Sequence, residues 1–174
     1  MKTLLLLRHA KSDRSAAVAS DHERPLNKRG RSSARRIGSA LSRIRQAPGK
    51  VLSSTAVRAL STAELAIEAG GWSCPVSTTR ALYLSSPDSA LGQIVEQNDR
   101  WESLLVVGHE PTCSDLASRL IGGGCIEVPT AALLRIDFDA ERWSEVAYGE
   151  GSLVWMLTPR LLARLGLDGE DDRG

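Results

Sequence analysis

The chain has 174 residues, of which 42% are hydrophobic, and it carries 22 basic and 21 acidic side chains. This length and apolar content suit one domain with a full-sized core. The near-balanced charge gives no long-range field, so we expect neither a nucleic acid nor a membrane as partner. The three cysteines are an odd number without a Cys-x-x-Cys pair, which argues against a disulfide framework or a thiolate zinc site and favours a reducing compartment.

A short apolar run at residues 4–7 consists of four leucines and ends in Arg8 and His9. The run is too short for a signal-peptide core or a membrane span, and we therefore expect a cytoplasmic protein. Such a run is typical of a central strand of a parallel sheet, covered on both faces. Ligands of open α/β sheets bind beyond the carboxyl ends of strands, and Arg8 beside His9 offers a forked anion clamp next to a nucleophile or general base.

A helical pattern follows a polar loop over residues 13–29. Apolar side chains recur at steps of three and four, which predicts an amphipathic helix that Pro48-Gly49 stops; they are Ala34, Ile37, Leu41 and Ile44. A short strand then begins at Val51. It leads to a second helix, which Ser54 or Thr55 would cap and which Gly70-Gly71 would end.

The second half of the chain repeats this alternation. We expect a strand over residues 74–78, a helix beginning at Ser86-Pro87-Asp88, a buried strand over 104–107 and a helix over 112–121. Residues 131–138 and 152–157 are predicted as an antiparallel pair near a sheet edge. The pattern predicts an α/β fold: a three-layer α/β/α sandwich with a mostly parallel central sheet. We expect one domain over residues 1–165 and a disordered tail over 166–174, which is rich in Gly and Asp.

Three strand ends carry residues that suit an anion. His9 follows one buried strand and His109 follows another, while Arg58 lies in the first turn of a helix after a third strand. In a parallel sheet these positions share one edge, where two arginines, two histidines and a helix N-terminus make a dense anion site. Taken singly, His109 is also explained as a turn residue and Arg58 as a surface cation.

The order of motifs adds a family resemblance. Leu7-Arg8-His9-Ala10-Lys11-Ser12 resembles the signature of the histidine phosphatase superfamily, which includes the phosphoglycerate mutase-like proteins. The Lys-Ser extension and residues 21–30 are similar to the branch of SixA-type phosphohistidine phosphatases. Further matches, in the right order over about residues 2–157, are Ser53-Ser54-Thr55-Ala56-Val57-Arg58-Ala59 with Thr62-Ala63-Glu64, then Leu82-Tyr83, then Val107-Gly108-His109-Glu110-Pro111.

This resemblance implies a phosphoglycerate mutase-like fold and a role for each matching residue. His9 would be the nucleophile that takes the phosphoryl group, and Arg8, Arg58 and His109 would hold its oxygens. Elementary chemistry agrees, because phosphoryl transfer needs an in-line nucleophile and charge complementary to the equatorial oxygens. Neighbouring cations should help keep the attacking imidazole neutral. Since these groups provide the charge and no carboxylates with metal-ligand spacing stand near them, we expect no metal and no other cofactor.

Two departures from the family pattern bear on the substrate. The larger phosphoesterase branches carry a carboxylic acid between the motifs that match Arg58 and His109. Residues 80–86 contain no acid, as in the SixA-type branch, so efficient cleavage of alkyl esters is not expected. Arg14 stands where the branch pattern has a tryptophan, a change that would alter the pocket wall.

Other residues have a functional and a structural interpretation. Lys11 and Ser12 would contact phosphate or cap the next segment, and Glu110 would act as an acid or shape the turn. Asp21 and Arg24 would lie at the pocket mouth or form a salt-bridged loop. The basic stretch over residues 28–45 suggests RNA binding at first, but its apolar stripe favours a solvated helix face.

The sequence therefore predicts a phosphatase that uses a phosphohistidine intermediate and acts on phosphohistidine in a protein. One alternative is a phosphomonoesterase for a small phosphorylated metabolite, and another is a non-catalytic module that binds a phosphorylated ligand. The short connections between elements contain no long inserted cap. An open site of this kind favours a phosphorylated protein as partner over a small enclosed phosphoester.

Overall fold

The computed structural model describes residues 1–166, so the predicted tail lies, apart from Gly166, outside the described residues. Strands and helices alternate along the chain as the sequence predicts. In chain order the elements are β1 (Lys2–Arg8), α1 (Lys28–Arg43), β2 (Lys50–Ser54), α2 (Val57–Gly70), β3 (Val76–Thr79), α3 (Pro87–Val95), β4 (Ser103–Gly108), α4 (Thr112–Leu120), β5 (Leu133–Phe138), β6 (Gly151–Leu157) and α5 (Pro159–Arg164). Short 3-10 helices occur at Asp21–Glu23, Arg80–Leu82 and Trp143–Glu145.

The strands form one six-stranded sheet in the order β3-β2-β4-β1-β5-β6. The pairs β1–β4, β2–β4 and β2–β3 are parallel, whereas β5 runs antiparallel to both β1 and β6. The predicted antiparallel pair at an edge of a mostly parallel sheet is therefore confirmed.

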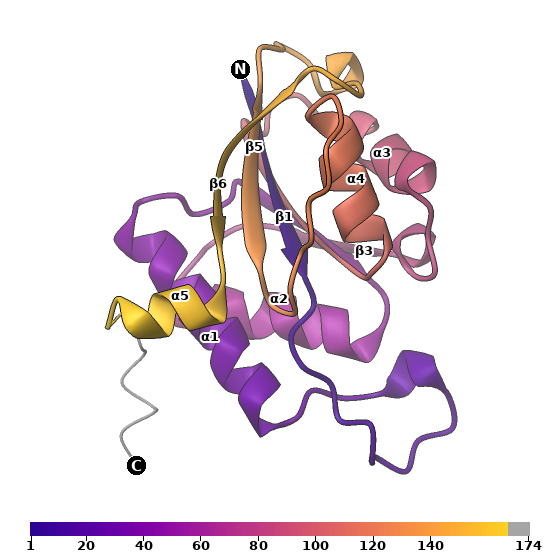
Figure 1. The fold of residues 1–174 in the computed structure, drawn as a ribbon, viewed down its shortest axis with the longest axis vertical. Coiled ribbons are helices and arrows are strands. Elements are labelled where there is room, and N and C mark those ends of the chain that lie inside the picture. Colours follow the sequence, from indigo (N-terminus) through magenta and orange to yellow (C-terminus); the bar gives the residue numbers. More distant parts are fainter. Residues whose placement is uncertain (167–174) are drawn as a thin grey trace.

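Helices cover both faces of this sheet (Figure 1). Leu5 and Leu7 of β1 pack on the face covered by α1, α2 and α5, and Leu4 and Leu6 pack on the face covered by α3 and α4. All four leucines are at most 1% exposed, because successive side chains of a strand point to opposite faces and both faces are covered here. The three-layer α/β/α prediction is confirmed.

The first predicted helix is shorter than its pattern suggests. It ends at Arg43, before the predicted stop at Pro48-Gly49. Arg45 adopts a left-handed backbone with φ of 56°, which a helix cannot continue. As a result Ile44 leaves the buried stripe and is 43% exposed.

The predicted cap of the second helix was also wrong. The capping position is Ala56, and neither Ser54 nor Thr55 occupies it. Ser54 belongs to β2, and its hydroxyl contacts His109 at the end of β4 instead. The next strand begins at Val76 rather than at residue 74, because Pro75 has no amide hydrogen for the sheet.

The parallel strands bring distant parts of the chain to one edge. Arg8 and Gly108 are partners at the carboxyl ends of β1 and β4, so His9 and His109 leave the sheet side by side. The neighbouring strand β2 feeds α2, which places Arg58 in the first turn of that helix. Within residues 1–166, no helix has the length and apolar character needed to cross a membrane.

Candidate active site

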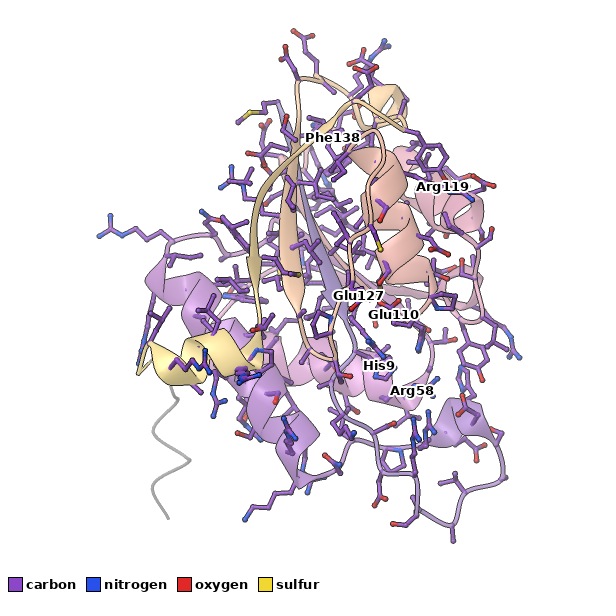
Figure 2. The ribbon with its side chains drawn as sticks, in the orientation of Figure 1. His9, Arg58, Glu110, Arg119, Glu127 and Phe138 are labelled. Carbon is purple, nitrogen blue, oxygen red and sulfur yellow. The ribbon has the colours of Figure 1, made fainter. Side chains whose placement is uncertain are left out.

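The four predicted catalytic side chains lie at the carboxyl edge of the sheet. Figure 2 shows His9 and Arg58 next to each other below the strand ends, far from Phe138 at the opposite end of β5. The rings of His9 and His109 have centroids 5.0 Å apart, and Arg58 Nε lies 3.3 Å from His9 Nε2. Arg8 donates from Nη1 to the carbonyl of Val128 at 2.9 Å, which ties the clamp to the loop before β5.

Hydrogen bonds define the tautomer of His9. Its Nδ1 lies 2.8 Å from the carbonyl oxygen of Ala10. A carbonyl can only accept, so Nδ1 carries the hydrogen in the neutral ring. Nε2 then keeps its lone pair, which accepts from Arg58 Nε. The ring thus presents an unprotonated nitrogen toward the space in front of Arg58.

The environment of His9 favours its neutral form. Burial, followed by the positive charges of Arg58, Arg8 and Arg24, lowers the pKa of His9 from 6.5 to about 4, against the opposing effect of the Ala10 hydrogen bond. A protonated imidazole has no lone pair on nitrogen to attack with. The lowered pKa therefore keeps His9 available as a nucleophile at neutral pH.

His109 is buried more deeply and is held by a serine. Its Nε2 lies 2.8 Å from Ser54 Oγ, and only 7% of the residue is exposed. Burial, then the nearby His9 and Arg58, lowers the pKa of His109 to about 3. Its Nδ1 is buried and has no hydrogen-bond partner in the described chain. Such an atom is costly unless a ligand completes its bonding.

Asp21 holds the guanidinium of Arg58 in place. Arg58 donates from Nη1 to the backbone carbonyl of Asp21 at 2.6 Å and from Nη2 to Asp21 Oδ2 at 2.9 Å. Only 5% of Arg58 is exposed. Arg24 makes a second ion pair with Asp21 at 3.1 Å. Burial alone would raise the pKa of Asp21, but Arg58 and Arg24 lower it below its usual value. The salt-bridged loop expected of Asp21 and Arg24 is therefore present, and through Asp21 it contacts Arg58.

Sequence reasoning assigned no role to two aromatic neighbours of this cluster. Tyr83 donates to Asp21 Oδ2 at 3.2 Å, and its ring meets that of His109 at a centroid distance of 5.6 Å. His22 packs edge-on against Tyr83 at 4.8 Å, and its Nε2 lies 2.9 Å from Thr55 Oγ1. The available signal was positional, because both residues fall inside segments that matched the family pattern.

The remaining predicted residues lie around the cluster rather than within it. Ser12 is buried and pairs with the backbone of Leu26 in a single β-bridge. Lys11 is exposed and lines a cavity that also includes Arg29. Glu110 follows His109 directly, and its Oε1 is buried without a hydrogen-bond partner in the described chain. Arg14 is exposed in the loop over residues 13–20.

No group of three or more His, Cys, Asp or Glu side chains within residues 1–166 is arranged to hold a metal ion. The cluster therefore combines two positively charged arginines with two neutral histidines, one of which presents an unprotonated nitrogen. This is the chemistry that a phosphoryl group requires.

Known proteins share this sequence pattern and fold. Residues 4–83 match the model of the histidine phosphatase superfamily (branch 1). An uncharacterized protein of Mycobacterium tuberculosis strain H37Rv is 38% identical over 166 residues, which cover 88% of this chain and all of that protein. A structure from Agrobacterium tumefaciens, provisionally assigned as the phosphohistidine phosphatase SixA, is 26% identical with a TM-score of 0.76 over 91% of this chain and 98% of that chain.

A tungstate complex of the protein histidine phosphatase SixA has the same fold. Its TM-score is 0.76 at 23% identity, over 92% of this chain and 99% of that chain. The order of motifs, the sheet topology and these similarities agree with one another. The chain belongs to the histidine phosphatase superfamily, in its SixA-type branch, and is a phosphatase.

Proposed function

We propose that this phosphatase removes the phosphoryl group from phosphohistidine in a protein, with His9 as the transient phosphoryl carrier. The observation that carries the proposal is the state of His9 Nε2. Its lone pair is free of a proton because Nδ1 donates to Ala10 and because burial keeps the ring neutral. With a pKa of about 4 the ring is a weak general base for water at neutral pH, whereas its lone pair remains available to attack phosphorus.

The reaction has two displacement steps. The substrate imidazole first takes a proton from solvent on its free ring nitrogen. His9 Nε2 then forms a bond to phosphorus while the P–N bond of the substrate breaks, and the imidazole leaves as the neutral ring. Water then attacks the phosphorylated His9 and releases inorganic phosphate, which returns Nε2 to its unprotonated form. Each step passes through a phosphoryl group whose charge lies on three equatorial oxygens.

We infer that three side chains stabilise those oxygens. Arg58 faces the attacking nitrogen directly, at 3.3 Å. Arg8 Nε and His109 Nδ1 are buried polar atoms without partners in the described chain, and phosphoryl oxygens would complete their bonding. Each such donor is worth roughly 3 kcal/mol in the transition state, by comparison with oxyanion-hole donors. For His109 to donate from Nδ1, Ser54 must donate to its Nε2, and their separation of 2.8 Å permits this bond.

The leaving group favours phosphohistidine over alkyl esters. An imidazole is readily protonated before it departs, whereas an alkoxide needs an acid in the transition state, and a positioned acid contributes ~10²–10⁴-fold. Residues 80–86 supply no carboxylate. Phosphoramidates and aryl phosphates should therefore react far faster than sugar or serine phosphates.

One observation supports a second candidate, a phosphomonoesterase for a small metabolite. Glu110 directly follows His109 and has a buried oxygen with no partner in the described residues. A carboxylic acid there would protonate an ester oxygen. If Glu110→Gln removes cleavage of an alkyl phosphate but spares phosphohistidine, this second activity is present as well.

The test compares wild type with His9→Ala on a phosphohistidine-bearing protein, an aryl phosphate and a set of alkyl phosphates. We expect His9→Ala to abolish all turnover while keeping the circular dichroism spectrum, because β1 supplies the packing. Rapid quench of the wild type should trap an acid-labile, base-stable phosphate. Persistent turnover in His9→Ala would remove the mechanism, and binding of aryl phosphate without any turnover would indicate a non-catalytic module.

A further inference from the structure

A basic groove lies beside the loop that follows β1, with Lys11 in its lining, and has no part in the mechanism above. It consists of two cavities of about 590 and 390 Å³ between the first half of α1, the start of α5 and residues 129–131. Figure 1 shows α5 lying across α1 at this place. The cavities share Arg29, Ser33, Pro159 and Arg160, so they form one continuous depression. Its cationic lining residues are Lys11, Lys28, Arg29, Arg36 and Arg160, and neither lining contains an acidic residue.

Most of these charges are not neutralised by the fold. Within residues 1–166, no ion pair joins Lys11, Lys28, Arg29 or Arg160 to a carboxylate. Elsewhere on α1, the exposed Arg35 does pair with a carboxylate, Glu68, at 3.7 Å. The groove therefore presents a concave surface of one sign.

The position of two of these cations is unfavourable for α1 itself. Lys28 and Arg29 are the first two residues of the helix, and its first turn contains no acid. The N-terminus of a helix carries partial positive charge and favours acidic residues. Local sequence choices that oppose local stability are expected where a function requires them. The arrangement of this helix start thus points to an anionic partner.

Two residues of the groove lining lie close to the backbone of His9. The amide of Ala131, which lines the groove, donates to the carbonyl of His9 at 3.3 Å. Lys11 follows His9 by two residues, so their Cα atoms are separated by at most ~7 Å. A chain that presents its phosphohistidine to His9 can therefore lay its neighbouring residues along the groove.

We propose that the basic groove binds an acidic segment of the phosphoprotein substrate next to the phosphohistidine. The inference rests on the proposed function. It adds that the enzyme recognises acidic residues of the substrate beside the phosphohistidine. The groove lining has no aromatic side chain on which nucleic-acid bases would stack. It also has no large apolar side chain that would enter a lipid surface. Carboxylates on a protein chain are the complementary partner, and they would raise encounter rate and affinity without changing the chemical step.

The test uses two synthetic peptides that contain one phosphohistidine, flanked by four Glu or by four Gln residues, together with an aryl phosphate. We expect the wild type to show a KM for the Glu peptide roughly tenfold below that for the Gln peptide, from several exposed ion pairs. Added salt should reduce this advantage. The double variant Arg29→Glu with Arg160→Glu should lose the advantage while keeping kcat/KM for the aryl phosphate.

A control variant on the same helix separates location from charge. Arg43 is exposed in the last turn of α1, 14 residues beyond Arg29 and about 21 Å along the helix axis. Arg43→Glu makes the same change in charge and should retain the preference for the Glu peptide. The milder pair Arg29→Gln with Arg160→Gln should reduce the preference partly, which guards against loss of folding in the double reversal.

Several results would overturn the assignment. Equal KM values for the two peptides in the wild type would remove it, and so would equal losses on peptide and aryl phosphate in the double variant. Tighter competition by single-stranded RNA than by the Glu peptide would assign the groove to nucleic acid. If the wild type shows no preference for the Glu peptide, but a variant with Asp168, Glu170, Asp171 and Asp172 replaced by their amides does, the groove takes this chain's own carboxylates instead.

A binding measurement distinguishes failure of this inference from failure of the proposed function. Fluorescence anisotropy of an unphosphorylated Glu peptide reports docking without turnover. Binding that Arg29→Glu weakens and Arg43→Glu does not would support the groove even if phosphohistidine were not hydrolysed. Hydrolysis of phosphohistidine with no difference between the peptides would support the function and overturn the groove.

Discussion

The two neutral histidines should make the stability of this protein depend on pH below neutrality. The folded state lowers the pKa of His9 to about 4 and that of His109 to about 3, from 6.5 in the unfolded chain. At pH values between about 3 and 6.5 the unfolded chain therefore binds more protons than the folded protein. The free energy of unfolding is therefore at its full value above pH 6.5 and falls as the pH is lowered through this window.

The size of the effect follows from these pKa values. Lowering the pH from 8 to 5 protonates each histidine almost completely in the unfolded chain and hardly at all in the folded protein. This costs about 2 kcal/mol of stability for each histidine, at 1.36 kcal/mol for a pKa unit. His109→Gln removes one of the two groups, so its stability should fall by about 2 kcal/mol less than that of the wild type over the same pH change.

Urea unfolding monitored by circular dichroism at pH 8 and pH 5 measures both differences. The buffers must contain no phosphate, because a ligand of the folded state would add its own binding energy. If the wild type and His109→Gln lose the same amount of stability between pH 8 and pH 5, then the fold does not hold His109 neutral. The explanation of the site through buried, uncharged imidazoles would then be wrong.

Two further perturbations test the packing and the site. A Cβ at Gly38 would lie 2.0 Å from the Ala66 carbonyl oxygen, whereas one at Gly92 meets nothing within 4 Å. Gly38→Ala should therefore destabilise the protein by about 1–3 kcal/mol in urea unfolding, while the matched Gly92→Ala should stabilise it by about 0.5–1 kcal/mol; equal effects would contradict the close approach of α1 to α2. Asp21→Asn weakens the support of Arg58 and should lower kcat on an aryl phosphate about tenfold without unfolding the protein. An unchanged kcat would show that Arg58 needs no such support.

Local patterns in the sequence predict most of the fold. The four buried leucines of β1, the glycine pair that ends α2 and the antiparallel pair β5–β6 follow from short-range composition and are present in the structure. Element ends were predicted less well. Helix α1 ends at Arg43 and α2 begins after Ala56, because the backbone of Arg45 and the contact of Ser54 with His109 override the local pattern.

The composition of the site and the expected neutral form of His9 also follow from the sequence, whereas the contacts that support the site residues do not. The motifs around His9, Arg58 and His109 identify the family and the residues that meet at the sheet edge. Their support comes from contacts across long stretches of chain: 55 residues separate Ser54 from His109, and 62 separate Asp21 from Tyr83. No periodicity or spacing in the sequence indicates such partners.

The sequence by itself determined the alternation of strands and helices, the central strand and the order of the phosphatase motifs. These depend on side-chain periodicity and on residues close together in the chain. Only the tertiary structure decided which nitrogen of His9 carries the hydrogen, through the Ala10 carbonyl and Arg58, and that burial lowers its pKa more than the neighbouring cations do. It alone also joined Lys11, Arg29 and Arg160 into one basic groove. The physical reason is that burial and electrostatic fields are sums over neighbours in space, and folding chooses those neighbours from distant parts of the chain.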